Sequence, residues 1–363
     1  MKIVLAFDSF KHCMRADDVC RCVRDGILST VPSAEVLSFP LADGGEGTVE
    51  AACRIAGKMP VQITVTGPLG ERRMAPVLLD EGLAVMEVAS ACGIEWVRPE
   101  DRDPMRTTTF GVGEMLREIA VQGNRRCVIG LGGSATVDGG IGMLRALGGR
   151  FYDSSGRETD SLTDVAGMEL PPELPEIEIL LASDVENLLC GPRGAAAVFG
   201  PQKGANPADI PVLDAALHRL QKLFGAEDLP GDGAAGGLGF AFRMLGAKRT
   251  SGARWMLQYA GFAEALAGAD LVITGEGCSD GQTAEGKLPW IVAEYAERSG
   301  VPVLLLSGAL GEGYDVLESR FAALCSLSAG PGTLEAALQS APQQLRRQGR
   351  NIANLLASAM GRG

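Results

Sequence analysis

One stretch of this chain reads Leu271-Val-Ile-Thr-Gly-Glu-Gly-Cys-Ser-Asp-Gly-Gln-Thr-Ala-Glu-Gly-Lys287. Its apolar start is typical of a buried strand, and it changes abruptly into a loop that holds four glycines, three acidic residues and a final lysine. A strand of a parallel sheet that ends in such a loop brings backbone amides, carboxylates and one cation to a single place. This combination suits a phosphate ester that is bound together with a divalent cation.

Strands and helices alternate on both sides of this stretch. Near the N-terminus, Val19, Val23 and Ile27 recur at a spacing of four residues, which predicts an amphipathic helix. Such alternation predicts an α/β fold with a parallel sheet and crossover helices. The expected elements are strands at 3–6, 35–39, 271–274, 303–306 and 321–324 and helices at 17–28, 48–56, 290–298, 314–318 and 334–356.

The pattern changes in the middle of the chain, where three closely spaced strands are expected at 61–65, 73–79 and 84–88, with a hairpin turn at 80–82. We therefore expect two domains, with the active-site cleft between them at the strand C-termini. A discontinuous Rossmann-like parallel-sheet domain is expected to comprise residues 1–60, 100–165 and 265–363. An inserted mixed α/β domain is expected to comprise residues 61–99 and 166–264, with residues 152–175 as a connection between the domains.

Length and composition narrow the class of protein. The 363 residues fit two domains, and 46% apolar and 21% charged residues predict a globular fold. The net charge of −12 argues against nucleic acid and anionic membranes as partners, and no apolar run approaches the ~20 residues of a membrane span. Nine scattered cysteines and an N-terminus that enters a strand at once indicate a cytoplasmic protein with reduced thiols. A homo-oligomer is left open.

Four loops rich in glycine and acidic residues follow predicted strands. Each loop alone is as typical of a tight turn or a helix cap as it is of a binding site. Because the carboxyl ends of parallel strands lie at one edge of a sheet, four such loops on one sheet would converge on a site. The loops are residues 6–11, 41–48, 130–140 and 275–287.

Two nucleotide-binding fingerprints are matched only in part. Residues 281–287 spell GxxxxGK, but Leu288 replaces the Ser or Thr that a P-loop requires. Lys287 still suits a phosphate, because it precedes a helix that begins with proline. Loop 130–140 resembles a degenerate dinucleotide fingerprint, yet Asp138 would repel a bare pyrophosphate unless a metal lay between them. A magnesium nucleotide resolves that conflict better than NAD does.

Six motifs run in order from the first strand to the last helix: Asp8-Ser-Phe-Lys11, Ala42-Asp-Gly-Gly-Glu-Gly-Thr48, Thr107-Thr-Thr-Phe-Gly111, residues 130–140, Val198-Phe-Gly-Pro-Gln-Lys-Gly204 and residues 275–287. Together they closely resemble the type 1 glycerate kinase family over essentially the whole chain. The resemblance implies ATP-dependent phosphorylation of D-glycerate, usually at the 2-hydroxyl, with Mg²⁺ and a two-domain α/β fold; the products would be 2-phospho-D-glycerate and ADP. Four positions depart from the family pattern, since Phe7 stands for Pro, Cys278-Ser279 for Arg-Ile and Leu188 for Pro.

Residue roles are assigned by charge and backbone flexibility, because phosphoryl transfer requires mainly positioning and charge neutralisation. Glu276 and Asp280 are the expected Mg²⁺ ligands, since hard cations prefer oxygen donors. The residues expected to bind the nucleotide belong to the glycine loops and are Gly132, Gly133, Ser134, Asp138, Gly275 and Gly277.

The catalytic candidates are two lysines and two aspartates. Lys11 and Lys287 would offset the charge of the phosphates. Asp43 or Asp184 would orient and deprotonate the substrate hydroxyl. A helix cap or a turn residue is an equal alternative for Asp184.

Substrate contacts are assigned to Asp8, Ser9 and Lys203, with an exposed turn lysine as the competing interpretation of Lys203. Other functions stay open beside the glycerate kinase. One is a kinase that acts on a related small hydroxy-acid or that gives 3-phosphoglycerate. Another is a NAD(P)-dependent oxidoreductase built on loop 130–140, and a third is a nucleotide sensor without turnover.

Overall fold

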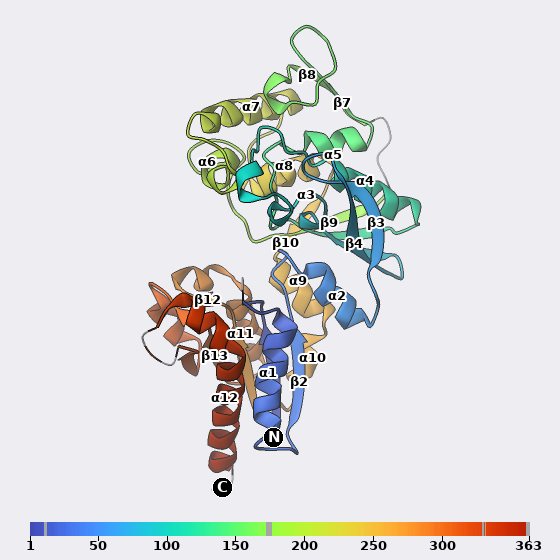
Figure 1. The fold of residues 1–363 in the computed structure, drawn as a ribbon. Coiled ribbons are helices and arrows are strands. Elements are labelled where there is room, and N and C mark those ends of the chain that lie inside the picture. Colours follow the sequence, from blue (N-terminus) through green and yellow to red (C-terminus); the bar gives the residue numbers. More distant parts are fainter. Residues whose placement is uncertain (11–12, 172–175, 329, 331, 361–363) are drawn as a thin grey trace. The chain divides into compact units, whose positions relative to one another are not determined.

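The computed structural model describes residues 1–10, 13–171, 176–328, 330 and 332–360 (Figure 1). Its contacts divide the chain into two compact units, each built around its own sheet. Unit 1 comprises Met1–Asp43 and Ala253–Gly363, and unit 2 comprises Gly44–Gly252. The fold is α/β, as the alternating pattern predicts.

Unit 1 contains a five-stranded sheet in which every pair of neighbours is parallel, in the order β15-β13-β11-β1-β2. Numbered within the unit, this is the doubly wound order 2-1-3-4-5, whose switch point lies between the first and third strands. Those strands are β1 and β11, so the opening sequence stretch leaves the sheet at the switch point. The strands are β1 (Lys2–Phe7), β2 (Glu35–Pro40), β11 (Leu271–Gly275), β13 (Val303–Ser307) and β15 (Ala323–Ser326).

Helices cover both faces of this sheet. Alternate residues of β1, among them Ile3 and Leu5, pack in one core with α1 and α12, while the intervening Val4 and Ala6 are also fully buried. Helix α11 contacts β1, β11 and β13. Burial on both faces explains why these strands are continuous apolar runs. The helices are α1 (Ala16–Leu28), α9 (Gly252–Tyr259, which begins at the last residue of unit 2), α10 (Phe262–Ala265), α11 (Leu288–Arg298) and α12 (Leu334–Met360).

Helices α1 and α12 lie side by side in Figure 1, and two glycines allow their backbones to meet. A Cβ atom on Gly26 would lie 2.1 Å from the carbonyl oxygen of Arg346, and one on Gly349 would lie 2.3 Å from that of Val23. Residues 314–318, predicted as a helix, form the 3₁₀ turn Tyr314–Ser319.

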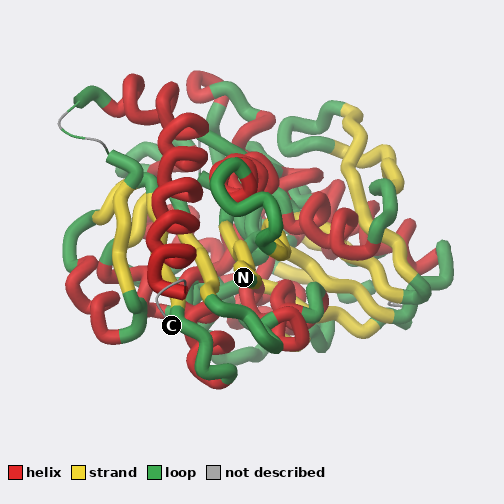
Figure 2. The backbone as a smooth tube through the Cα atoms, turned by 90° about the horizontal axis from the view of Figure 1, so that it is seen from below, coloured by secondary structure: helices red, strands yellow, loops and turns green. Residues whose placement is uncertain are grey.

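Unit 2 contains a six-stranded mixed sheet in the order β10-β9-β6-β5-β4-β3 (strands in yellow, Figure 2). Strands β10, β9, β6 and β5 are parallel, and β4 pairs antiparallel with both β5 and β3. The predicted hairpin joins β4 to β5 with positive φ at Glu81 (47°) and Gly82 (88°), as a two-residue hairpin turn requires. The strands are β3 (Val61–Thr66), β4 (Arg72–Asp80), β5 (Leu83–Glu87), β6 (Arg126–Gly130), β9 (Glu178–Ala182) and β10 (Lys248–Thr250).

The helices of unit 2 surround this sheet, and the four-residue α3 follows directly after β5. They are α2 (Thr48–Ala56), α3 (Ala89–Cys92), α4 (Phe110–Val121), α5 (Ile141–Ala146), α6 (Ala195–Phe199), α7 (Asp209–Phe224) and α8 (Leu238–Met244). A separate antiparallel pair joins β7 (Arg150–Tyr152) to β8 (Gly167–Glu169), and β8 lies in residues 152–175, the segment predicted to connect the domains. Residues 172–175 of that segment lie outside the described residues.

The predicted domain boundaries differ from the structure in three places. Residues 44–60 and 100–165, predicted for the first domain, lie in unit 2, and residues 253–264, predicted for the second, lie in unit 1. In the structure β6, which lies within 100–165, pairs with β5 on one side and with β9 on the other. The reason is that alternation of strand and helix reveals a parallel sheet but not which of two sheets a given strand joins.

Candidate functional site

The carboxyl edge of the sheet in unit 1 gathers most of the predicted residues of that unit. Asp8 directly follows β1 and is buried, with 8% of its surface exposed. Its backbone N–H donates to the carbonyl of Gly275 at 3.1 Å, and its carboxylate accepts the N–H of Ser9 at 2.6 Å. Asp43 follows β2, the next strand, and is half-buried. The carboxyl edge of the sheet therefore carries carboxylates from separate parts of the chain. Lys11 lies outside the described residues.

Glu276 follows β11 at the same edge and is held by hydroxyl groups. Its Oε1 accepts from Ser279 Oγ at 3.0 Å and from Thr283 Oγ1 at 2.8 Å. Ser279 Oγ lies 2.7 Å from Ser307 Oγ, and these three hydroxyl-bearing residues are fully buried. Burial raises the pKa of Glu276 above its ordinary value. The carboxylate thus has a fixed orientation, and Ser279, one of the departures from the family pattern, supplies one of its donors.

Asp280 and Lys287 form an ion pair at the end of the same loop. Asp280 caps the 3₁₀ turn Gly281–Glu285, since its carboxylate accepts the N–H of Gln282 at 3.0 Å. Lys287 Nζ lies 3.2 Å from Asp280 Oδ1, and the two side chains are 34% and 31% exposed. Lys287 is also the N-cap of α11, which has proline in its first turn. A partly exposed ammonium group therefore lies at the start of a helix, where anions are favoured.

Of the two glycines that begin this loop, Gly275 has a packing role. A Cβ atom on Gly275 would lie 1.9 Å from the carbonyl oxygen of Leu306. The carbonyl of Gly277 accepts the N–H of Ala309 at 3.1 Å, next to the short parallel pair β12 (Cys278–Ser279) and β14 (Ala309–Leu310). Close backbone approach explains Gly275, and the nucleotide contact of Gly275 and Gly277 stays a prediction.

The predicted magnesium ligands Glu276 and Asp280 fit a metal that arrives with its nucleotide. Across the part of the chain that the structure describes, no group of three or more His, Cys, Asp or Glu residues is placed to hold a metal ion. Mg²⁺ commonly keeps several waters and binds proteins through one or two carboxylates together with substrate phosphates. Two carboxylates on one loop satisfy that lower requirement, whereas an all-protein cage does not exist among these residues.

In unit 2, two of the predicted loops meet backbone to backbone. The N–H of Gly132 donates to the carbonyl of Gly44 at 3.4 Å. A Cβ atom on Gly130 would lie 2.4 Å from the oxygen of Gly44, and one on Gly132 would lie 2.6 Å from the Cα atom of Gly45. Only glycine permits this approach, so residues 44–48 and loop 130–140 converge, although the strands before them, β2 and β6, belong to two sheets and not to the single sheet that was predicted. Gly133, at a φ of 77°, begins the turn toward Ser134.

The carboxylate of Asp138 is used within the fold. It is 6% exposed and accepts the N–H and the hydroxyl of Thr109 at 2.8 Å each, the N–H of Gly140 at 3.0 Å and that of Gly142 at 3.3 Å. These donors belong to the N-termini of α4 and α5. Asp138 therefore caps two helices, a role that the sequence did not suggest, and its contact with the nucleotide stays a prediction.

One interpretation of Lys203 requires a correction. The residue is 3% exposed, and its Nζ donates to Ser134 Oγ at 2.9 Å and to the carbonyl of Thr136 at 2.8 Å. Burial lowers its pKa to about 8. The exposed-turn interpretation is therefore wrong, because the ammonium group is buried under loop 130–140 and holds it in place. Contact of Lys203 with the substrate carboxylate stays a prediction.

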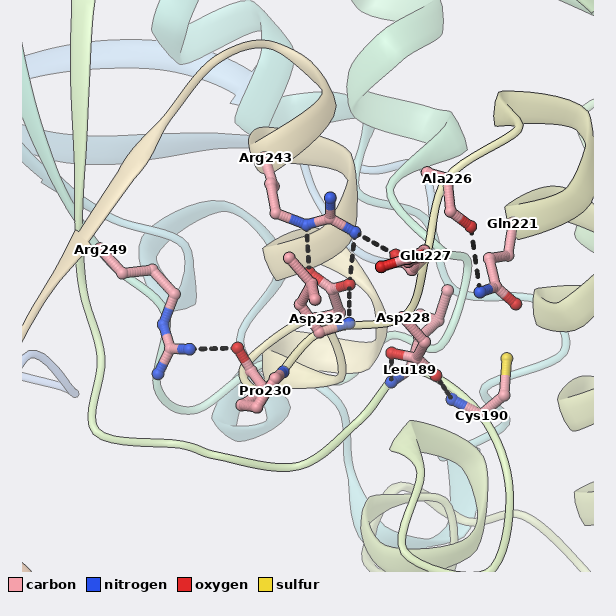
Figure 3. A network of polar contacts seen from close by, with 11 residues as sticks. Leu189, Cys190, Gln221, Ala226, Glu227, Asp228, Pro230, Asp232, Arg243 and Arg249 are labelled. Carbon is pink, nitrogen blue, oxygen red and sulfur yellow. Dashed lines mark hydrogen bonds and ion pairs between the residues drawn. The ribbon is translucent and has the colours of Figure 1, made fainter.

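Asp184 lies where the sequence predicts it, at the carboxyl edge of the parallel strands of unit 2. It follows β9 and is exposed. The segment after it is fixed by a polar network that the sequence did not suggest (Figure 3). Asp228 accepts the N–H groups of Leu189 and Cys190, and Asp232 pairs with Arg243 at 2.6 Å. This network orders the backbone beyond the predicted catalytic aspartate.

One buried carboxylate near these loops was missed altogether. Glu87 ends β5 and is 8% exposed. In the sequence it is the last residue of a predicted strand and carries no local motif. Only its cross-strand partner Gly130, the first residue of loop 130–140, reveals its position.

The fold and the carboxyl edges of its two sheets define an α/β enzyme. Its glycine loops and half-buried charges lie at the carboxyl ends of strands, where such enzymes bind phosphorylated ligands. Among the described residues, none of the helices is both long and apolar enough to cross a bilayer. The sequence profile of the glycerate kinase family matches residues 3–357. The chain belongs to the glycerate kinase family, and it is therefore an enzyme, a kinase.

Three relatives illustrate the similarity. The glycerate 2-kinase of Escherichia coli K12 is 39% identical over 377 residues and covers 99% of both chains. The glycerate kinase of Bacillus subtilis 168 is 39% identical over 370 residues and covers 97% of both chains. A crystal structure from Salmonella typhimurium LT2, assigned as glycerate kinase 2, superposes with a TM-score of 0.85 at 40% identity over 99% of both chains.

Proposed function

We propose that this enzyme transfers the terminal phosphoryl group of ATP to the 2-hydroxyl of D-glycerate, giving 2-phospho-D-glycerate and ADP, with Mg²⁺. The observation that carries the proposal is the full-length similarity to a relative named glycerate 2-kinase, at 39% identity. A cytoplasmic location is part of the proposal. It is supported by the nine cysteines, none of which forms a disulfide, as suits a reducing compartment.

The proposed roles in unit 1 rest on charge and position. Lys287 neutralises phosphate charge at the start of α11, and Glu276 and Asp280 hold Mg²⁺ that the nucleotide brings. The metal, when bound, supplies further neutralisation of the phosphate oxygens. Asp8 and Ser9 contact the acceptor substrate, and Asp43 is one candidate for the group that takes the proton from its hydroxyl. Lys11 keeps its predicted role beside the phosphates.

The proposed roles in unit 2 follow the backbone of its loops. Gly133 and Ser134 present a backbone amide and a hydroxyl to the nucleotide phosphates, as glycine loops at strand ends commonly do, and Gly132, whose N–H donates to Gly44, allows the close approach of the backbone. Lys203 acts through Ser134 and Thr136, so its effect on the nucleotide is indirect. Asp184 is the second candidate for the proton acceptor, supported by its exposed position after β9.

The reaction is tested with the purified protein, MgATP and D-glycerate, by coupled detection of ADP and by phosphorus NMR of the product. We expect ADP release that depends on D-glycerate and a product whose phosphate is on the 2-oxygen. Glycerol serves as a matched acceptor that lacks the carboxylate and is expected to react at least tenfold more slowly. The absence of glycerate-dependent ADP release would overturn the proposal, and a 3-phosphate product would correct its regiochemistry.

A binding measurement separates the proposal from an oxidoreductase. MgATP is expected to raise the melting temperature, and NADH and NADPH at equal concentration are not, because binding to the native state alone stabilises it. Stabilisation by a nicotinamide nucleotide and not by MgATP would favour the oxidoreductase. Stabilisation by MgATP without turnover on any small hydroxy-acid would favour a nucleotide sensor.

A further inference from the structure

Glu87 supplies a helix cap that the local sequence of α2 lacks. The first residue of α2 is Thr48, and its N-cap is Gly47, which has no side chain to accept a hydrogen bond. Glu87 Oε2 accepts the N–H of Thr48 at 3.0 Å, and the N–H of Val49 also points to this carboxylate. The unpaired N–H groups of a helix start require acceptors, and an anion there is further favoured by the helix dipole. A strand thus caps a helix that is distant in sequence.

The same carboxylate lies between the two glycine loops of unit 2. The residue that pairs with Glu87 on β6 is Gly130, at the start of loop 130–140. The helix that Glu87 caps, α2, begins directly after residues 44–47. A Cβ atom on Gly130 would lie 2.4 Å from the carbonyl oxygen of Gly44. Glu87 therefore fixes the position of residues 44–47 against the start of loop 130–140.

Both oxygens of Glu87 are used internally. Oε1 accepts the hydroxyl of Ser90 at 3.3 Å, and Oε2 accepts the backbone of α2. The carbonyl of Ser90 in turn accepts Arg73 Nε from β4 at 2.9 Å. A carboxylate with both oxygens engaged is suited to hold neighbouring groups and not to take a proton from a substrate.

We propose that Glu87 is a positioning residue of the phosphoryl-transfer reaction, whose ionised carboxylate holds the start of α2, and with it residues 44–47, in register with loop 130–140. This inference rests on the proposed kinase function. It assigns to Glu87 no contact with nucleotide or glycerate.

The ionisation of Glu87 is expected to control this positioning near neutral pH. Burial and the nearby Glu46 raise the pKa of Glu87 to about 7, while the N–H groups of α2 and the hydroxyl of Ser90 oppose the rise. The charged groups around it are Glu46, on the loop before α2, and Arg73, which reaches the backbone of Ser90 from β4. A protonated carboxyl group accepts hydrogen bonds less strongly than a carboxylate. Turnover is therefore expected to increase as pH rises through about 7.

The first test compares kcat at saturating MgATP and D-glycerate between pH 5.5 and 8.5 for the intact enzyme and for Glu87→Gln. We expect the variant to lose at least tenfold in kcat at pH 8 and to lose the inflection near neutral pH. Glu114→Gln is a matched control, since Glu114 also accepts a backbone N–H, that of Thr66 at 2.5 Å, but belongs to α4. It is expected to keep the inflection. A kcat and a pH profile of Glu87→Gln equal to those of the intact enzyme would overturn the proposal.

Two further variants sharpen the test because they move the pKa of Glu87 in opposite directions. Ser90→Ala removes a hydrogen bond that lowers this pKa, so the inflection is expected to shift to higher pH. Glu46→Gln removes a charge that raises it, so the inflection is expected to shift to lower pH. Shifts of the same sign, or no shift in either variant, would overturn the assignment of the inflection to Glu87.

Hydrogen exchange of residues 44–56 tests the positioning without any turnover. At pH 8, the backbone amide hydrogens of this segment are expected to exchange at least tenfold faster in Glu87→Gln than in the intact protein. The melting temperature of the variant is expected to stay within a few degrees of that of the intact protein. Unchanged exchange would overturn the proposal even in an active enzyme. Faster exchange in a protein that does not phosphorylate glycerate would instead place the failure in the proposed function.

Discussion

Loop 275–287 of unit 1 and loop 130–140 of unit 2 have the same kind of sequence, yet the fold uses their charges differently. In unit 1, Asp280 and Lys287 pair with each other and are about one-third exposed. In unit 2, Asp138 and the lysine that reaches the loop, Lys203, are almost fully buried and bond to backbone and hydroxyl groups. The comparison teaches that glycine and charge at a strand end predict a loop of defined shape, and that burial decides whether the charge meets a ligand or supports the loop.

The physical cause of the difference is what surrounds each loop. Asp138 lies between the N-termini of α4 and α5, whose N–H groups need acceptors. Asp280 lies over a single 3₁₀ turn and accepts only locally, so it remains accessible to Lys287. A buried charge persists only when it is fully bonded, and a half-exposed one retains capacity for an incoming phosphate or cation.

The largest effect is expected for Asp138→Ala. The substitution leaves four donors at two helix starts without their acceptor, so the free energy of unfolding of unit 2 should fall by about 3 kcal/mol or more. Urea denaturation checks this value. The control is Asp280→Ala, which removes one partly exposed helix cap and should lower the free energy of unfolding of unit 1 by about 1 kcal/mol. Equal losses in the two variants would contradict the contrast between the loops.

The second effect concerns the pH dependence of stability around Lys203. Its pKa in the folded protein is about 8, below the ordinary 10.5, so between these pH values the unfolded state binds more protons and the free energy of unfolding rises with pH. The rise should amount to at most about 3 kcal/mol. Denaturation between pH 7 and pH 10.5 measures it against Lys203→Met, which lacks this group. Parallel curves would show that the ammonium group is not buried in solution.

A third prediction isolates chemistry from stability in unit 1. Lys287→Met should lower kcat for glycerate phosphorylation at least tenfold, roughly 1.4 kcal/mol or beyond, because a cation beside the transferred phosphoryl group is lost. The melting temperature should change by only a few degrees, since the ion pair with Asp280 is partly exposed and weak. Near-normal turnover in this variant would remove Lys287 from the proposed machinery.

The smallest effect is expected for Ser279→Ala, which removes the hydroxyl group that is hydrogen-bonded to both Glu276 and Ser307. A loss of about 1 kcal/mol in the free energy of unfolding of unit 1 is expected. Because the Ser279 hydroxyl lowers the pKa of Glu276, its removal should raise that pKa further. NMR titration of the Glu276 carboxyl carbon measures the shift, and a downward shift would contradict the hydrogen-bond arrangement.

Much of the fold follows from local patterns. Alternating strands and helices predicted the α/β class, and the turn at Glu81 and Gly82 predicted the hairpin of β4 and β5. The sheet to which β6 belongs was not predictable, because both sheets accept an apolar parallel strand. The sequence located the loops that carry the candidate residues. It did not show the burial of Asp138 and Lys203 or the capping role of Glu87, because these depend on partners 29 to 69 positions away in sequence.

The sequence by itself determined the class of fold, the places where backbone turns tightly and the kinds of charge carried there, because these depend on neighbours within a few residues. The tertiary structure decided which strands share a sheet and which of those charges are enclosed. The physical reason is that solvation of a carboxylate or an ammonium group is set by the elements packed around it, and those arrive from distant parts of the chain.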